Sequence, residues 1–78
     1  MRLYNESGQA VNFGNTRIAA SGNERVGQND LKNLILNGTS YPIQFNTGRT
    51  IQNEDHYLII RGSTFWLCNS AHDDIGHY

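Results

Sequence analysis

Apolar and polar residues alternate along the first part of the chain in a pattern typical of short β-strands. Val11 and Phe13 are two positions apart, so they lie on one face of a strand, and the asparagine between them points to the other face. Polar turn residues separate this strand from an earlier apolar pair, which predicts a hairpin between residues 3–4 and 10–13. Residues 16–20 fit a third strand and an irregular link equally well.

The spacing of apolar residues changes from two to three or four near position 31. Leu31, Leu34 and Ile35 follow the i, i+3, i+4 spacing of a helix face. Gly38 comes shortly afterwards and suits the left-handed residue that closes a helix. We therefore expect one short helix over about residues 29–37. Because so short a helix is unstable alone in water, its apolar side is expected to pack on a sheet.

Alternation returns after the predicted helix, with Tyr41, Ile43 and Phe45 on one side of a strand. The strand expected over residues 56–61 carries an unbroken apolar run at positions 57–60, as expected for a central strand that is covered on both faces. Gly62-Ser63 has the glycine-first form of a two-residue type II′ turn. The apolar residues that follow are therefore expected to pair antiparallel with the central strand.

These elements predict an α+β, β-rich domain. One short helix, at about residues 29–37, packs on one face of an antiparallel sheet of five or six short strands. With 78 residues the chain has room for a single domain. We expect residues 1–71 to form this compact domain and residues 72–78 to form a polar, flexible C-terminal tail.

Charge and composition narrow the range of functions. The formal net charge of -1 gives no general attraction to nucleic-acid phosphates. The first residues lack the basic region and apolar run of a signal peptide, and no apolar run approaches the roughly 20 residues that cross a bilayer. The single cysteine, Cys68, has no partner in the chain for a disulfide, which fits a reducing compartment. A cytoplasmic protein that does not contact membranes is expected.

Residue types that bind metal ions gather near the C-terminus. They are Cys68, His72, Asp73, Asp74 and His77, with His56 on the neighbouring strand. Most zinc sites combine two paired clusters, and the sequence has one. A polar terminus without a metal is therefore the favoured interpretation. A metal-binding domain that uses the C-terminal Cys/His/Asp cluster, with His72, Asp73 and His77 as candidate ligands, is kept as an alternative.

Catalytic motifs are missing from the sequence. There is no G-x-S-x-G elbow, and the glycines are too dispersed to form a phosphate-binding loop. The presence of serine, histidine and aspartate alone is what ordinary composition supplies. We therefore expect a protein that is not an enzyme and that needs no cofactor.

A single-stranded nucleic-acid binder is a second alternative. Arginines beside turns and aromatic residues on strands are the groups that hold single strands. They are Arg17, Arg25, Arg49, Arg61, Tyr57 and Trp66. Acidic residues lie in the same loops and reduce the positive field, so this alternative is not favoured over binding to protein.

The favoured hypothesis is a small non-enzymatic protein-binding or inhibitor module that acts on a larger protein partner. Aromatic and arginine side chains near turns dominate the energetics of interfaces, which selects Tyr41, Arg49, Arg61 and Trp66 as partner-binding candidates. The size and texture of the chain resemble those of small proteins from phages and other mobile elements, including anti-defence inhibitors such as anti-CRISPR proteins. An exposed edge strand also makes a homodimer conceivable.

Overall fold

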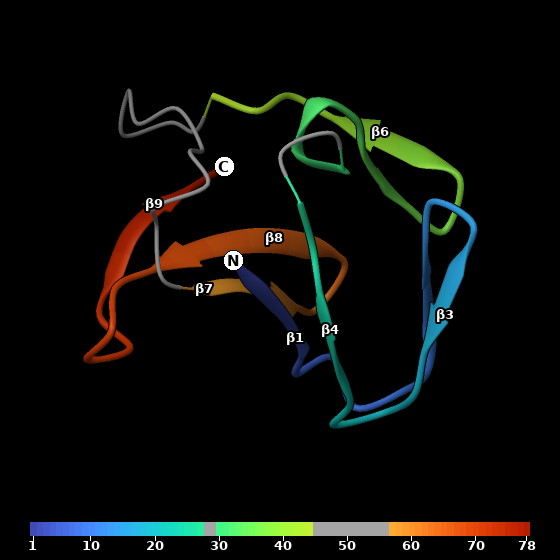
Figure 1. Cartoon of the computed structure of the whole chain (residues 1–78), viewed down its shortest axis with the longest axis horizontal. Coiled ribbons are helices and arrows are strands. Elements are labelled where there is room, and N and C mark those ends of the chain that lie inside the picture. Colours follow the sequence, from blue (N-terminus) through green and yellow to red (C-terminus); the bar gives the residue numbers. More distant parts are fainter. Residues whose placement is uncertain (28–29, 45–56) are drawn as a thin grey trace.

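Two β-sheets form the described part of the chain in a computed structural model, which describes residues 1–27, 30–44 and 57–78 (Figure 1). The five-stranded sheet has the order β4-β1-β7-β8-β9 and the four-stranded sheet the order β3-β2-β5-β6. The first consists of β1 (Arg2–Asn5), β4 (Asn23–Arg25), β7 (Tyr57–Arg61), β8 (Thr64–Cys68) and β9 (Asp74–His77). The second consists of β2 (Val11–Phe13), β3 (Thr16–Ile18), β5 (Leu34–Leu36) and β6 (Thr39–Tyr41).

The strands of each sheet are antiparallel neighbours, with one exception. β1 pairs with β4 in the antiparallel sense and with β7 in the parallel sense, so the N-terminal strand lies inside the five-stranded sheet. In Figure 1, β3 and β6 of the four-stranded sheet lie on the right, and β9, an edge of the five-stranded sheet, lies on the left. β7 is the middle strand of the five-stranded sheet, as its apolar sequence predicts.

The core lies between the two sheets. Inward-facing residues from strands of both sheets, together with Val26, form one apolar cluster. Its buried members are Leu3, Val11, Phe13, Ile18, Val26, Leu34, Leu36, Leu58, Ile60, Phe65 and Leu67. The rings of Phe13 and Phe65, one from each sheet, meet edge to face with their centroids 5.8 Å apart. Burial on facing sheet surfaces is the main force that holds so small a chain together.

One polar side chain, Asn5, is buried among these residues with 1% of its surface exposed. Its amide nitrogen donates to the carbonyl oxygens of Gln9 at 2.7 Å and Ala19 at 3.1 Å. Its oxygen accepts hydrogen bonds from the backbone N–H and the hydroxyl of Ser7. The Asn5 side chain therefore closes the loop between β1 and β2 and ties it to the end of β3.

The predicted helix over residues 29–37 is wrong. The described residues contain no α-helix: the chain makes a single 3₁₀ turn, η1 (Asp30–Lys32), and then enters β5. Leu34 and Leu36 are buried and Ile35 between them is half-buried, which is the period of a strand. The reason is the following Asn-Gly pair, which forms a hairpin turn to β6 with positive φ at Asn37 (51°) and Gly38 (85°).

The α+β class with one antiparallel sheet is therefore also wrong, and the fold is built from two β-sheets. No helix in the described residues has the length and hydrophobicity of a membrane span. The predicted hairpin between residues 3–4 and 10–13 is likewise incorrect, because β1 and β2 belong to different sheets. β6 ends at Tyr41, so Ile43 lies beyond the strand, and Phe45 lies outside the described residues.

Other local predictions are confirmed. Val11 and Phe13 are buried and Asn12 is exposed, as predicted. Of the two alternatives left open for residues 16–20, the chain forms a strand over Thr16–Ile18. β7 and β8 pair antiparallel around Gly62, whose φ is +60°, as the type II′ turn requires.

Within the segment expected to be a flexible tail, the structure places Asp74–His77 in β9, paired with β8.

Candidate functional site

The five-stranded sheet has one face against the core and one face that points away from it, here called the outer face. Strand register places two rows of residues across all five strands on the outer face. The first row is Arg25, Arg2, Tyr57, Cys68 and Asp74. The second row is Asn23, Tyr4, Ile59, Trp66 and His77. Arg61 and Thr64 continue the face at the β7–β8 turn. Five chain segments thus bring aromatic and charged side chains onto one surface.

Aromatic rings occupy the centre of the outer face. The Trp66 ring is stacked on His77, with centroids 4.5 Å apart and an interplanar angle of 16°. The Arg61 guanidinium lies 5.5 Å from the centroid of the same ring. Tyr57 meets Tyr4 edge to face at 5.3 Å. These half-exposed side chains combine apolar area with polar tips, the composition of residues that dominate protein interfaces.

Carboxylates lie beside the two groups that contact Trp66. Arg61 Nε lies 3.2 Å from Glu6 Oε1, and both side chains keep more than a third of their surface exposed, 37% and 43%. His77 Nδ1 lies 2.8 Å from Asp74 Oδ2, and the other oxygen of Asp74 accepts the backbone N–H of Gly76 at 3.0 Å. His77 Nδ1 has no hydrogen bond of regular geometry, so stacking on Trp66 places the imidazole, while the Glu6 pair restricts the rotamer of Arg61. The surface around Trp66 is preorganised by these contacts.

Two arginines lie at the β1–β4 side of the outer face. Arg2 and Arg25 are directly opposite each other in the antiparallel pair. Arg2 Nη1 donates to the amide oxygen of Asn23 at 2.7 Å. Among the described residues, neither arginine forms an ion pair. This side of the face is therefore positively charged.

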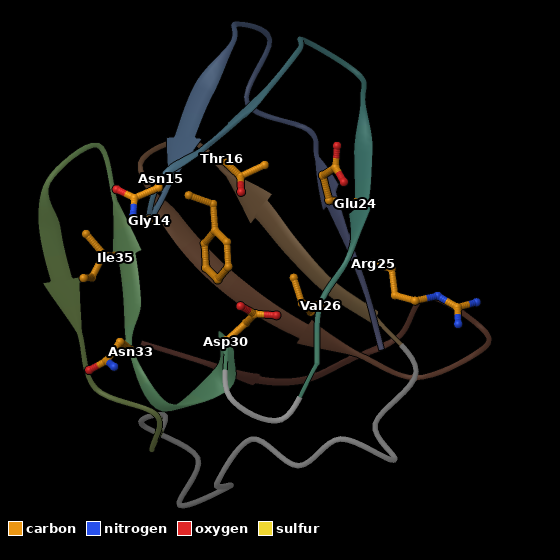
Figure 2. Close-up of a pocket in the computed structure, with 10 residues that line it drawn as sticks. Gly14, Asn15, Thr16, Glu24, Arg25, Val26, Asp30, Asn33 and Ile35 are labelled. Atoms are coloured by element: carbon orange, nitrogen blue, oxygen red, sulfur yellow. The ribbon is translucent and has the colours of Figure 1, made fainter.

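A separate recess of about 310 Å³ opens between the two sheets. Buried Phe13 and Val26 contribute to its lining, and Glu24 and Asp30 add carboxylates. Figure 2 shows β4 on one side of the recess and Asn33 and Ile35 on the other, with the Arg25 side chain directed away from it.

At this recess, Asp30 closes a turn of the backbone. Its Oδ2 accepts the backbone N–H of Gly27 at 2.8 Å, and its own N–H donates to the Gly27 carbonyl at 3.1 Å. Asp30, one of the two carboxylates that line the recess, is thus engaged in closing a turn. The outer face is therefore a stronger candidate site than the recess.

Comparison with known proteins gives no assignment. No family model matches the chain, and no curated protein or solved structure matches it. Its function is therefore inferred from the residues of the two sites.

The structure brings two of the four predicted partner-binding residues together. Arg61 and Trp66 are neighbours on the outer face. Tyr41 lies in β6 of the other sheet, where its ring packs at 5.6 Å from Phe65 and its hydroxyl donates to the Ser63 carbonyl at 2.6 Å. This position links the two sheets and is separate from the outer face. Arg49 lies outside the described residues.

The proposed metal ligands are also placed by the structure. The His72 ring lies against Tyr57 with centroids 4.8 Å apart and the ring planes tilted by 31°, and His77 is stacked on Trp66. Asp73 is exposed, and its backbone N–H donates to the Asn69 side chain. Within residues 1–27, 30–44 and 57–78, no three His, Cys, Asp or Glu side chains are grouped to hold a metal ion. His56 lies outside the described residues.

Cys68 is a buried free thiol on the same sheet, as its apolar strand predicts. Burial raises the pKa of the Cys68 thiol above its usual value. The charge of Arg61 offsets part of this increase in pKa, and Asp74 adds to it. The thiol is therefore neutral at pH 7, and a neutral buried thiol is a poor nucleophile and a poor metal ligand.

Sequence reasoning missed Arg2 and Tyr4 as members of the site. The alternation of Arg2, Leu3 and Tyr4 was a usable signal, since it places the first and third on the face opposite the buried leucine. The position of β1 between β4 and β7 was not predictable from local pattern, because these strands come from distant parts of the chain.

Proposed function

We propose that the protein is a non-enzymatic binding or inhibitor module that docks a larger protein partner on the outer face of its five-stranded sheet. The observation that carries this proposal is the placement of Arg61 over the Trp66 ring, with Glu6 and His77 holding the pair from either side. Arginine and tryptophan are the residue types in which binding energy concentrates, and preorganised side chains lose little entropy on binding.

The contacts that the Trp66 and Tyr57 rings already make favour a protein partner over single-stranded nucleic acid. Base stacking needs aromatic surface that is free to receive a base. Trp66 is already stacked on His77 and covered by the Arg61 guanidinium, and Tyr57 is in contact with His72 and Tyr4. A protein surface can instead pack against the edges of these rings and bond to their polar tips.

The same contacts support a binding role for the outer face over a catalytic one. His77, which would be its candidate base, is stacked on Trp66 and lies beside Asp74. Cys68, which would be its candidate nucleophile, is buried and neutral. The chain resembles small anti-defence inhibitors of mobile elements in size, and from this resemblance we predict that the partner belongs to a host defence system.

Affinity capture with matched variants tests the proposal. The immobilised chain is incubated with extract of its source cells, captured proteins are identified by mass spectrometry, and the complex is rebuilt from purified components. Arg61→Glu reverses a charge at the centre of the outer face. Arg17→Glu makes the same change at an exposed position of β3 in the other sheet. Circular dichroism confirms that both variants are folded.

We expect the native chain and Arg17→Glu to bind the same protein at near-stoichiometric yield, and Arg61→Glu to retain less than a tenth of it. Equal recovery by both variants would place the interface elsewhere. Capture that disappears after nuclease treatment would support the nucleic-acid alternative. Absence of any stoichiometric partner, combined with turnover of a small molecule by the purified chain, would overturn the binding role.

A further inference from the structure

The arrangement of Arg2 and Arg25 indicates what kind of partner segment the outer face accepts. The two residues are directly opposite in the β1–β4 ladder, and Arg2 is also in register with Tyr57 in the parallel β1–β7 ladder. Directly opposite side chains of an antiparallel pair lie on the same face, roughly 5 Å apart at their Cβ atoms. Two guanidinium groups and a tyrosine are therefore adjacent.

This placement works against the stability of the free chain. Like charges directly opposite in a ladder are destabilising. The one polar contact of Arg2 is with the neutral amide of Asn23, and within the described ranges neither arginine has a carboxylate partner. The chain does use carboxylates nearby, since Glu6 pairs with Arg61 and Asp74 with His77. The carboxylates of Glu6 and Asp74 thus lie beside other groups and not beside Arg2 or Arg25.

We propose that Arg2 and Arg25 bind the carboxylates of an acidic segment of the protein partner. The inference rests on the proposed docking role of the outer face and adds the chemistry of what docks there. Guanidinium groups match carboxylates through paired, charge-assisted hydrogen bonds, which are stronger than neutral ones. Strand β4 is an edge strand whose three residues are all exposed, so the segment has access to both arginines.

The charges around the arginines favour an acidic peptide over a nucleic-acid backbone. A nucleic acid presents one phosphate at every nucleotide, so its backbone would also approach Glu6 and Asp74 on the same face. A peptide can place two or three carboxylates at the β1–β4 side and neutral residues over the Trp66 region. The arginines and the aromatic centre would then contact different parts of one partner.

An NMR titration with defined probes tests the inference. The ¹⁵N-labelled full chain is titrated with hexaglutamate at low salt, and in parallel with hexaglutamine, oligothymidylate and inorganic phosphate. The doubly substituted variant carries Arg2→Gln and Arg25→Gln. The matched control, Arg17→Gln, removes one exposed arginine from the other sheet. Thermal unfolding of each variant is measured alongside.

We expect hexaglutamate to shift the amides of residues 2–4 and 23–26, and hexaglutamine to leave them unchanged. The double variant should bind hexaglutamate about tenfold more weakly, and Arg17→Gln should match the native chain. The melting temperature of the double variant should equal or exceed that of the native chain, because a like-charge repulsion is removed. A merely structural role for the arginines would lower the melting temperature.

Unchanged hexaglutamate binding in the double variant would overturn the inference, as would tighter binding of oligothymidylate or phosphate than of hexaglutamate. Failure here is distinguishable from failure of the docking role. If a captured partner is lost with Arg61→Glu but retained with the double variant, the acidic-segment inference is wrong and the docking role stands. If both variants retain the captured partner, the acidic-segment inference and the docking role are both wrong.

Discussion

The guanidinium of Arg61 lies 5.5 Å from the centre of the Trp66 ring, across the β7–β8 hairpin. The type II′ turn at Gly62 creates this relationship, because it pairs Arg61 with Thr64 and leaves Trp66 two residues further along the same face. A short local motif therefore assembles the centre of the candidate site. Glu6, which directly follows β1, then forms an ion pair with Arg61.

Replacing Arg61 with Gln should lower the free energy of unfolding by about 0.5 to 1 kcal/mol, because it removes an exposed cation–π contact and a surface ion pair. Urea unfolding measures the change. A double-mutant cycle with Trp66→Leu, which removes the aromatic ring, isolates the contact, and we expect a coupling energy of about 0.5 kcal/mol. Arg17→Gln, on the other sheet, should change stability by less than about 0.5 kcal/mol. A coupling energy of zero would contradict the arrangement of the pair.

Asn5→Ala should be among the most destabilising single substitutions, at about 2 to 4 kcal/mol. It empties a buried side-chain position and removes the donor of the part-buried hydrogen bonds to the carbonyl oxygens of Gln9 and Ala19 and of the buried one to Ile18. For a chain of this size each kcal/mol corresponds to a fall of about 4–8 °C in melting temperature. Asn12→Ala, at an exposed position, is the matched control and should have little effect. Similar melting temperatures for the two variants would contradict the role of Asn5.

Gly38→Ala tests the turn that replaces the predicted helix. With φ at +85°, a side chain at position 38 is strained, and we expect a loss of about 1 to 2 kcal/mol. Gly27 is the matched control, since its φ is ordinary and an added Cβ would meet Asp30 Oδ2 at 3.7 Å, a normal contact. Gly27→Ala should be close to neutral. Equal effects of both substitutions on urea unfolding would argue against a hairpin at residues 36–39.

The stability of the protein should fall at alkaline pH partly through Tyr78. Burial, with a smaller contribution from Tyr41, raises the pKa of Tyr78 to about 12 from an ordinary value near 10. Because the folded pKa is the higher one, its contribution is fully present below pH 10 and is lost as the pH rises towards 12. Melting temperatures between pH 9 and 12 should therefore fall less steeply for Tyr78→Phe. An identical slope for both proteins would contradict this burial.

Local chemistry decided which parts of the fold were predictable. The β7–β8 hairpin followed from a glycine-first turn between two apolar runs, and the antiparallel pairing predicted from it is the one that brings Arg61 and Trp66 together. Leu34 and Ile35 fit a helix stripe with Leu31, while Leu34 and Leu36 fit one face of a strand, and Gly38 fits both a helix C-cap and a type I′ turn. Burial of Leu34 and Leu36 in the core between the sheets decided for the strand. The Asn37-Gly38 pair was the local signal for this hairpin, and burial between the two sheets is the tertiary contribution that the local pattern does not show.

The remaining part of the site depends on long-range pairing. Arg2 and Tyr4 join the outer face because β1 pairs with β7, more than fifty positions later in the chain. A parallel pairing of this kind has no connecting turn to identify it in the sequence. The recess in Figure 2 was missed for the same reason, since its lining comes from both sheets.

Hydroxyl-radical footprinting of the native chain, free and bound to a captured and purified partner, tests the central claim most directly. Mass spectrometry reads oxidation at Trp66, Tyr57 and His77 on the outer face, and at Ile35 and Ile43 elsewhere on the surface. We predict that the partner reduces oxidation of the three outer-face residues several-fold and leaves both isoleucines unchanged. Protection of Ile35 and Ile43 with undiminished oxidation of Trp66 would contradict docking on the outer face.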